Sequence, residues 1–125
     1  MMKLLVTGGL GFIGSNFILN VLKNTNFEIL NVDAEFYGSN HYNLIEIENL
    51  EKYSFVKGDI TDKKLMENLI SKCDCVVNFA AESHVDRSIL DPSPFLNSNI
   101  FGTFTILDII KNQKKRLVHV STDEV

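Results

Sequence analysis

Short apolar runs alternate with segments of helical periodicity along the chain. The runs that predict β-strands lie at residues 4–6, 29–32, 54–56, 75–79 and 117–120. A run without polar interruption, such as Leu4-Leu5-Val6, is typical of a strand buried on both faces of a parallel sheet. The alternation predicts an α/β fold with a Rossmann-type, doubly wound parallel sheet of strand order 3-2-1-4-5 and the fifth strand at an edge.

Helical spacing of apolar residues predicts helices over about residues 11–22, 61–70 and 91–110. Either Thr61 or Asp62 can cap the second helix. Pro92 suits the first turn of the third, because the backbone donor that proline lacks would have no partner there. Residues 34–52 are ambiguous, and a short helix after a loop would bring together Leu44, Ile47 and Leu50. No repeat or linker interrupts the pattern, which indicates one domain over residues 1–125.

Composition narrows the classes of function. A chain of 125 residues with 45% apolar content can form one soluble domain. Its net charge of −4 disfavours a nucleic-acid-binding surface, and the basic run at residues 114–116 is interpreted as a solvated turn. Cys73 and Cys75 are expected to be reduced packing residues rather than metal ligands. Apolar runs reach only about six residues, too short for a membrane span, so we expect a cytoplasmic protein.

A glycine-rich turn follows the first predicted strand. Two patterns overlap there, G-x-x-G-x-x-G at Gly8, Gly11 and Gly14, and G-x-G-x-x-G beginning at Gly9. Such glycines let backbone amides approach a pyrophosphate at the positive end of a helix. By itself the motif also fits a plain tight turn, but its place between a buried strand and a helix favours dinucleotide binding.

Asp33 ends the second predicted strand, at the distance from the glycines that suits a ribose ligand. Its carboxylate can accept hydrogen bonds from the adenine ribose and would repel a 2′-phosphate, which favours NAD over NADP. An ordinary turn aspartate is the alternative.

All of the predicted strands end in small or polar residues: Gly8, Asp33, Asp59, residues 80–83 and residues 122–124. In open α/β sheets, ligands bind outside these carboxyl ends. We therefore expect one binding site along this edge of the sheet.

Two segments resemble the dTDP-glucose 4,6-dehydratase family of the extended short-chain dehydrogenase/reductase superfamily. They are Ala-Ala-Glu-Ser-His-Val-Asp-Arg-Ser-Ile at residues 80–89 and Ser-Thr-Asp-Glu-Val at residues 121–125. The similarity covers all 125 residues, including residues 7–14, 55–60 and 99–103. It implies NAD-dependent dehydration of dTDP-glucose: oxidation at C4, loss of water across C5 and C6, and return of the hydride to C6.

The resemblance also implies roles for particular residues. Asp123 would protonate the departing C6 hydroxyl, Glu124 would take the C5 proton, and Thr122 would bind the sugar near C4. The two acids need different protonation states at one pH, and the strand must end near Thr122 for both to reach one sugar. No metal is implied. Ser83 would also contact the substrate, and cofactor contacts are expected at Gly8, Gly11, Phe12, Ile13, Gly14, Asp33, Ala34, Glu35, Phe36, Asp59, Ile60, Phe79, Ala80, Ala81, Glu82, Ser83 and Ser98.

Within the segment at residues 80–89, His84 is assigned no catalytic step. Glu82, Asp86 and Arg87 are expected to hold the loop through local ion pairs.

One element of the family pattern is missing. The hydride step uses a Tyr-x-x-x-Lys pair, and Tyr53 and Lys57 alone have this spacing. They lie in the third strand, which leads to the adenine side, so we reject them as the catalytic pair. We expect an incomplete NAD-binding domain, truncated after its fifth strand, without the sugar-nucleotide-binding lobe and inactive alone.

Two alternatives stay open. Another nucleotide-sugar dehydratase or epimerase is one, although the adjacent acids at Asp123 and Glu124 argue against an epimerase. The other is a non-catalytic NAD-binding module. The dTDP base rests on the resemblance alone, which also implies a nucleotide-sugar substrate, no membrane partner and a homodimer for the full-length family member.

Overall fold

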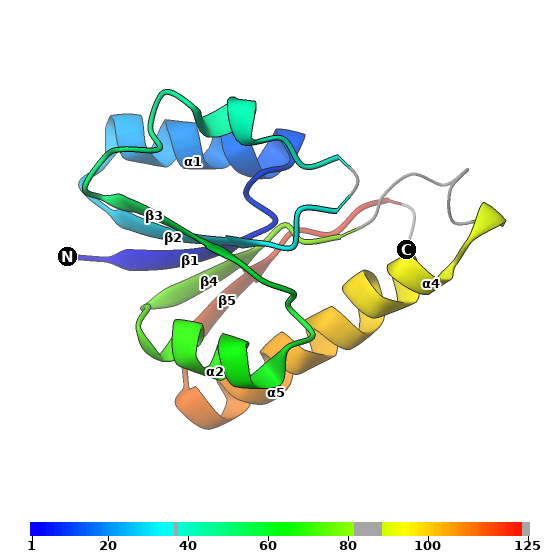
Figure 1. The fold of residues 1–125 in the computed structure, drawn as a ribbon. Helices are drawn as coiled ribbons and strands as arrows, with labels where there is room; N and C mark the ends of the chain where they lie inside the picture. The colour runs from blue at the N-terminus through cyan, green and yellow to red at the C-terminus, as the bar shows by residue number, and fades with distance from the viewer. Residues whose placement is uncertain (37, 82–88, 124–125) are drawn as a thin grey trace.

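The computed structural model describes residues 1–36, 38–81 and 89–123. Its strands form one parallel sheet in the order β3-β2-β1-β4-β5 (Figure 1). The predicted strand order and the edge position of the fifth strand are therefore confirmed. The strands are β1 (Lys3–Thr7), β2 (Glu28–Asp33), β3 (Tyr53–Lys57), β4 (Cys75–Asn78) and β5 (Arg116–His119).

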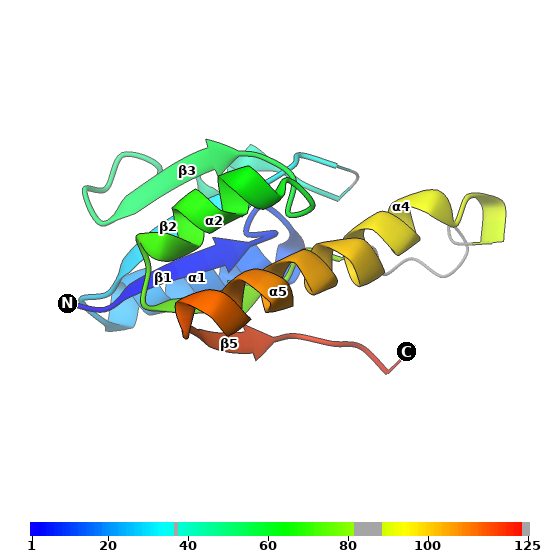
Figure 2. The same ribbon diagram turned by 90° about the horizontal axis from the view of Figure 1, so that it is seen from below.

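Helices cover both faces of the sheet, as a doubly wound fold requires. One face carries α1 (Phe12–Asn24) and the 3₁₀-helix η1 (His41–Leu44). The other carries α2 (Lys63–Ser71) and α5 (Thr103–Gln113), which lie side by side in Figure 2. A short α4 (Ser93–Phe95) and a π-helical segment η2 (Leu96–Gly102) lead into α5.

Alternation along β1 divides the core into two layers. Leu5, fully buried, packs with Met66 of α2 and Ile106 of α5. Val6 points to the opposite face and packs with Ile18 of α1. Successive side chains of a strand point to opposite faces, so a wholly apolar β1 is the natural centre of a sheet covered on both sides.

Two helical predictions need correction. Residues 34–52 form a 3₁₀-helix at His41–Leu44 followed by turns, not a helix through Leu50. The turns close by short-range bonds, from Ile47 N to Leu44 O and from Leu50 N to Ile47 O, which do not build α-helical periodicity. The helix predicted from residue 91 begins at Ser93 and contains the π-helical segment η2, which apolar spacing alone cannot reveal.

The structure identifies the N-cap of α2 and shows the environment of the two cysteines. Asp62, rather than Thr61, caps α2, because Asp62 Oδ1 accepts a hydrogen bond from Leu65 N at 3.1 Å. Cys73 and Cys75 are free and buried, in agreement with their predicted packing role. Desolvation raises the pKa of both thiols, that of Cys73 to about 11.

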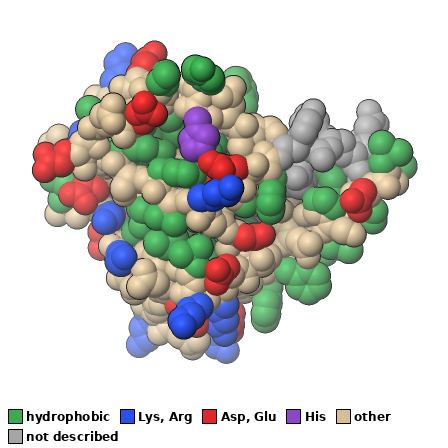
Figure 3. Space-filling model, in the orientation of Figure 1, with side chains coloured by type: hydrophobic (Ala, Val, Ile, Leu, Met, Phe, Trp, Pro, Cys, Tyr) green, Lys and Arg blue, Asp and Glu red, His purple; other side chains and the backbone are tan. Residues whose placement is uncertain are grey.

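Blue and red side chains are interspersed over the face seen in Figure 3. Within the described ranges, no helix has the length and apolar character needed to cross a membrane, and no three His, Cys, Asp or Glu residues cluster as metal ligands.

We predict that Cys73 makes folding stability fall at alkaline pH. Its pKa is about 11 in the fold against an ordinary 9.0, so the unfolded state loses the thiol proton first as pH rises through 9. The free energy of unfolding should then fall by about 2 kcal/mol between pH 8 and pH 11 from this group. Urea unfolding across that range should show a shallower decline in Cys73→Ala. An identical decline in both proteins would contradict the prediction.

Candidate functional site

A cleft of about 350 Å³ runs along the carboxyl edge of the sheet. That volume lies within the ordinary range for small-molecule sites. Its walls come from the glycine turn, the loops after β2 and β3, the end of β4, and η2. The lining residues are Gly8, Gly11, Phe12, Ile13, Gly14, Val32, Asp33, Ala34, Phe36, Gly38, Ser39, Gly58, Asp59, Ile60, Phe79, Ala80, Ala81 and Ser98.

The structure thus brings most of the expected cofactor contacts around one cavity. Glu35 does not line it, and Glu82 and Ser83 lie outside the described residues, as do His84, Asp86 and Arg87. Sequence reasoning missed four lining residues: Val32 and Gly58, which adjoin predicted aspartates, and Gly38 and Ser39, which lie in the loop after β2. Only the neighbourhood of Val32 to Asp33 and of Gly58 to Asp59 could have indicated any of them, because none carries a motif of its own.

The glycine turn lies against the backbone of the neighbouring strands. Gly8 has a φ of +70°, and its N–H donates to Val32 O at 2.9 Å. A Cβ at Gly8 would lie 2.7 Å from Ala80 N, and one at Gly14 would lie 2.5 Å from Gly8 O. Side chains are therefore excluded at both positions, and the start of α1 is held at the cleft.

The N-terminus of α1 has the features of an anion site. Gly11 is its N-cap, and among the described residues no side chain caps this helix. The first turn contains no acidic residue. The first residues of the helix, Phe12 and Ile13, border the cleft. The backbone N–H groups of this first turn and the positive end of the helix dipole suit a phosphate group.

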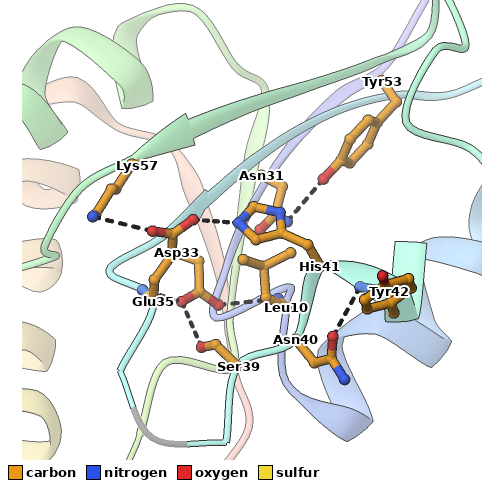
Figure 4. Close-up of polar contacts among 10 residues, drawn as sticks. All are labelled: Leu10, Asn31, Asp33, Glu35, Ser39, Asn40, His41, Tyr42, Tyr53 and Lys57. Atoms are coloured by element: carbon orange, nitrogen blue, oxygen red, sulfur yellow. Dashed lines mark hydrogen bonds and ion pairs between the residues drawn. The ribbon is translucent and has the colours of Figure 1, made fainter. Parts of the chain in front are cut away.

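Asp33 ties the glycine turn to the loop after β2. Its side chain is buried, with Oδ2 accepting from Leu10 N at 3.0 Å (Figure 4). Its Oδ1 accepts from Glu35 N at 2.7 Å and from Ser39 Oγ at 2.9 Å. An ionised carboxylate has about four lone-pair positions, so these contacts leave capacity for a ligand hydroxyl.

Glu35 holds the same loop from outside the cleft. Its backbone φ is +61°, a left-handed conformation that favours glycine. The side chain pairs with His41 Nε2 and with Lys57 Nζ, the latter at 3.1 Å. Hydrogen bonds from His41 and then Lys57 lower the pKa of Glu35. Glu35 thus supports the loop after β2 from outside the cleft, and its expected contact with the cofactor stays a prediction.

The loop after β3 and the segment η2 also have defined positions at the cleft. Asp59 Oδ1 accepts from both Thr61 N and Thr61 Oγ1 at 2.9 Å, which fixes the turn after β3. Ser98, buried in η2, lines the cleft along with Ile60. The π-helical segment thus brings the connection between β4 and β5 to the cleft.

The chain end that carries the candidate catalytic residues lies beyond the same edge of the sheet (Figure 1). The strand ends at His119, before Thr122, and both Thr122 and Asp123 are exposed. Neither lines the cleft, and Glu124 lies outside the described residues. The structure therefore does not bring Thr122 or Asp123 into the cleft.

A chain of polar contacts joins this end to the centre of the sheet. Thr7 Oγ1 hydrogen-bonds Asn78 Oδ1, and Asn78 Nδ2 contacts His119 Nδ1 at 3.1 Å. Backbone bonds continue it, because Val120 N donates to Asn78 O at 3.1 Å. The ends of β1, β4 and β5 are thereby held in one register.

We predict different tolerances for two glycines of the motif. Gly14→Ala should lower the free energy of unfolding by about 3 kcal/mol, because its Cβ would meet a backbone oxygen at 2.5 Å. The matched control Gly11→Ala should cost less than about 1 kcal/mol, since the nearest atom, Gly8 O, is 3.4 Å away. Urea unfolding measures both, and equal losses would show that the close approach is absent.

Comparison with known proteins identifies relatives of the whole described fold. A dTDP-glucose 4,6-dehydratase of Mycolicibacterium smegmatis is 46% identical over 99% of this chain and 37% of its own length. DesIV, a dTDP-glucose 4,6-dehydratase from Streptomyces venezuelae crystallised with NAD, superimposes with a TM-score of 0.94 at 43% identity, covering 99% of this chain and 40% of that one.

A UDP-glucose-4-epimerase from Stenotrophomonas maltophila with bound NAD matches less well, with a TM-score of 0.86 and 29% identity over 100% of this chain and 38% of that one.

The likenesses to the M. smegmatis and S. venezuelae enzymes confirm the resemblance to dTDP-glucose 4,6-dehydratases. The chain spans about 37% of the M. smegmatis relative. The family model for GDP-mannose 4,6 dehydratase matches residues 5–125. Since this match extends over nearly the entire chain, the chain belongs to the GDP-mannose 4,6 dehydratase family.

Proposed function

We propose that a protein carrying this domain binds NAD in the cleft and catalyses the 4,6-dehydration of a nucleotide-activated hexose, with dTDP-glucose as its substrate. The observation that carries the proposal is the cleft itself, in which the glycine turn, Asp33 and Asp59 converge. The likeness to DesIV, a dehydratase crystallised with NAD, supports both the cofactor and the reaction.

The residues present fit NAD. In the proposal its pyrophosphate lies at the N-terminus of α1, where Phe12 and Ile13 begin the helix. Asp33 accepts from the adenine ribose, and Asp59 and Ile60 border the adenine. Phe36, Phe79, Ala80, Ala81 and Ser98 supply further walls, while Glu82 and Ser83 are proposed to complete the site. A second negative charge, the 2′-phosphate of NADP, would face the buried Asp33 carboxylate.

The proposed chemistry divides between the cofactor and the chain end. When bound, NAD supplies reversible hydride acceptance at C4 of the sugar, which acidifies the C5 proton. Glu124 takes that proton as a base, and Asp123 donates a proton to the C6 hydroxyl, which leaves as water. Thr122 and Ser83 position the sugar. The net reaction would be elimination of water from the hexose.

The relatives are longer than this chain, and we propose that the rest of the active site belongs to polypeptide outside these residues. That includes the sugar-nucleotide-binding lobe and the Tyr-x-x-x-Lys pair of the hydride step. We accordingly expect no dehydratase activity from the 125-residue chain alone, and we propose a homodimeric, cytoplasmic full-length protein. An epimerase has weaker support, because the epimerase likeness is only 29% identical.

Asp33 should determine which dinucleotide the chain prefers. The chain should bind NAD weakly and more tightly than NADP, because the Asp33 carboxylate lines the cleft and is proposed to accept from the adenine ribose. Asp33→Asn should reduce the preference about tenfold by removing the negative charge. Asp108→Asn is the matched control, since Asp108 pairs with Lys63 at 2.8 Å on the exposed face of α2 and α5. Calorimetric titration measures each affinity, and tighter NADP binding by the unaltered chain would refute the proposed role of Asp33.

The two acids should have separable effects in a protein of the relatives' length that carries this domain. Asp123→Asn should slow elimination but spare C4 oxidation, so reduced cofactor accumulates and absorbs in the near ultraviolet. Glu124→Gln should also trap reduced cofactor, but it should suppress exchange of the C5 hydrogen with solvent by about 10²-fold or more. Equal C5 exchange in both variants would mean that Glu124 is not the base.

A further inference from the structure

An amide side chain is buried in the middle of β2. Asn31 is completely buried, and its neighbours Leu30 and Val32 belong to the apolar core. Burying an amide is unfavourable unless its donors and acceptor find partners. The hydrogen bonds of Asn31 therefore have a structural role that an apolar side chain at this position could not fill.

Both ends of the Asn31 amide are bonded, and Figure 4 shows the contact with Tyr53. Its Oδ1 accepts a hydrogen bond from Gly9 N at 3.1 Å, and its Nδ2 donates to Tyr53 Oη at 3.1 Å. A backbone N–H can only donate, so Gly9 requires the oxygen of the amide. The NH₂ group then faces β3, where the phenol of Tyr53 is its acceptor.

The glycine turn lies directly on this amide. A Cβ at Gly9 would be 2.2 Å from Asn31 Oδ1, which leaves no room between them. The next residue is held in the same way, because Leu10 N donates to Asp33 Oδ2 at 3.0 Å. Two successive N–H groups of the turn are thus bonded to side chains of β2, and the first bond depends on the orientation of Asn31.

Tyr53 is suited to orient that amide. It is buried on the edge strand β3, and burial raises the pKa of its phenol, so the hydroxyl stays neutral. A phenylalanine of the same shape would leave Asn31 Nδ2 without this acceptor. Lys57, its partner in the Tyr-x-x-x-Lys spacing, pairs instead with Glu35, so both residues of that sequence pair support the cleft from outside.

We propose that Tyr53 is a positioning residue for dinucleotide binding: through Asn31, its hydroxyl fixes the backbone of the glycine turn at Gly9. The consequence for affinity rests on the proposed NAD site, whereas the consequence for the Gly9 amide does not. Tyr53 touches no ligand in this proposal, since it does not line the cleft.

Tyr53→Phe removes only the hydroxyl and tests the proposal on the full chain. Tyr42→Phe is the matched control, because Tyr42 is exposed and its side chain has no place in this set of contacts. Amide hydrogen exchange measured by NMR should be about tenfold faster at Gly9 in Tyr53→Phe, with Leu5 and Val6 of β1 changed far less. The dissociation constant for NAD should rise about tenfold, and neither value should change in Tyr42→Phe.

A double-mutant cycle identifies the route. In an Asn31→Ala background, Tyr53→Phe should have no further effect on Gly9 exchange or on NAD affinity, because the amide that connects Tyr53 to Gly9 is already absent. An effect as large as in the unaltered chain would overturn the proposal. So would unchanged Gly9 exchange, or an equal acceleration at Gly9, Leu5 and Val6, which would indicate only a loss of global stability.

A failure to bind NAD can be distinguished from a failure of the positioning role of Tyr53. If the unaltered chain does not bind NAD, the cofactor proposal is wrong, while the exchange rate of Gly9 still decides whether Tyr53 positions the turn.

Discussion

The close approach of the glycine turn to two neighbouring strands is the constraint on which the cleft depends. Gly8 lies against the backbone at Ala80, and Gly14 lies against Gly8 itself, at distances that exclude a side chain. This contact places the N-terminus of α1 beside the ends of β2 and β4. Without it, the loops that form the other walls would face an ordinary helix end rather than a cavity.

Buried polar side chains hold the turn where the missing side chains leave room for it. Asn31 and Asp33 bind successive N–H groups of the turn, and Asn78 joins Thr7 to His119 across the sheet. Each of these polar side chains occupies a buried position in the core, so the cost of its desolvation must be offset by hydrogen bonds. The carboxyl half of the sheet therefore gives up some apolar burial for a defined arrangement of backbone donors.

The cleft and the chain end differ in how they are supported. The cleft is built on the central strands β1, β2 and β4, whose residues are almost all buried. The candidate acid Asp123 follows β5, an edge strand whose residues are largely exposed and whose end is held through Asn78. The position of Asp123 is therefore supported by one edge strand, whereas the cleft rests on three buried strands.

The sequence by itself determined the strand order, the site along one sheet edge and most residues of the cleft. Apolar runs, glycine spacing and strand-end residues are local signals, and parallel topology converts them into one place. Only the tertiary structure decided that η2 is π-helical, that Glu35 faces Lys57 and His41, and that Ser39 and Tyr53 support the site. These features depend on contacts between residues distant along the chain or on loop backbone angles, and neither leaves a periodic pattern in the sequence.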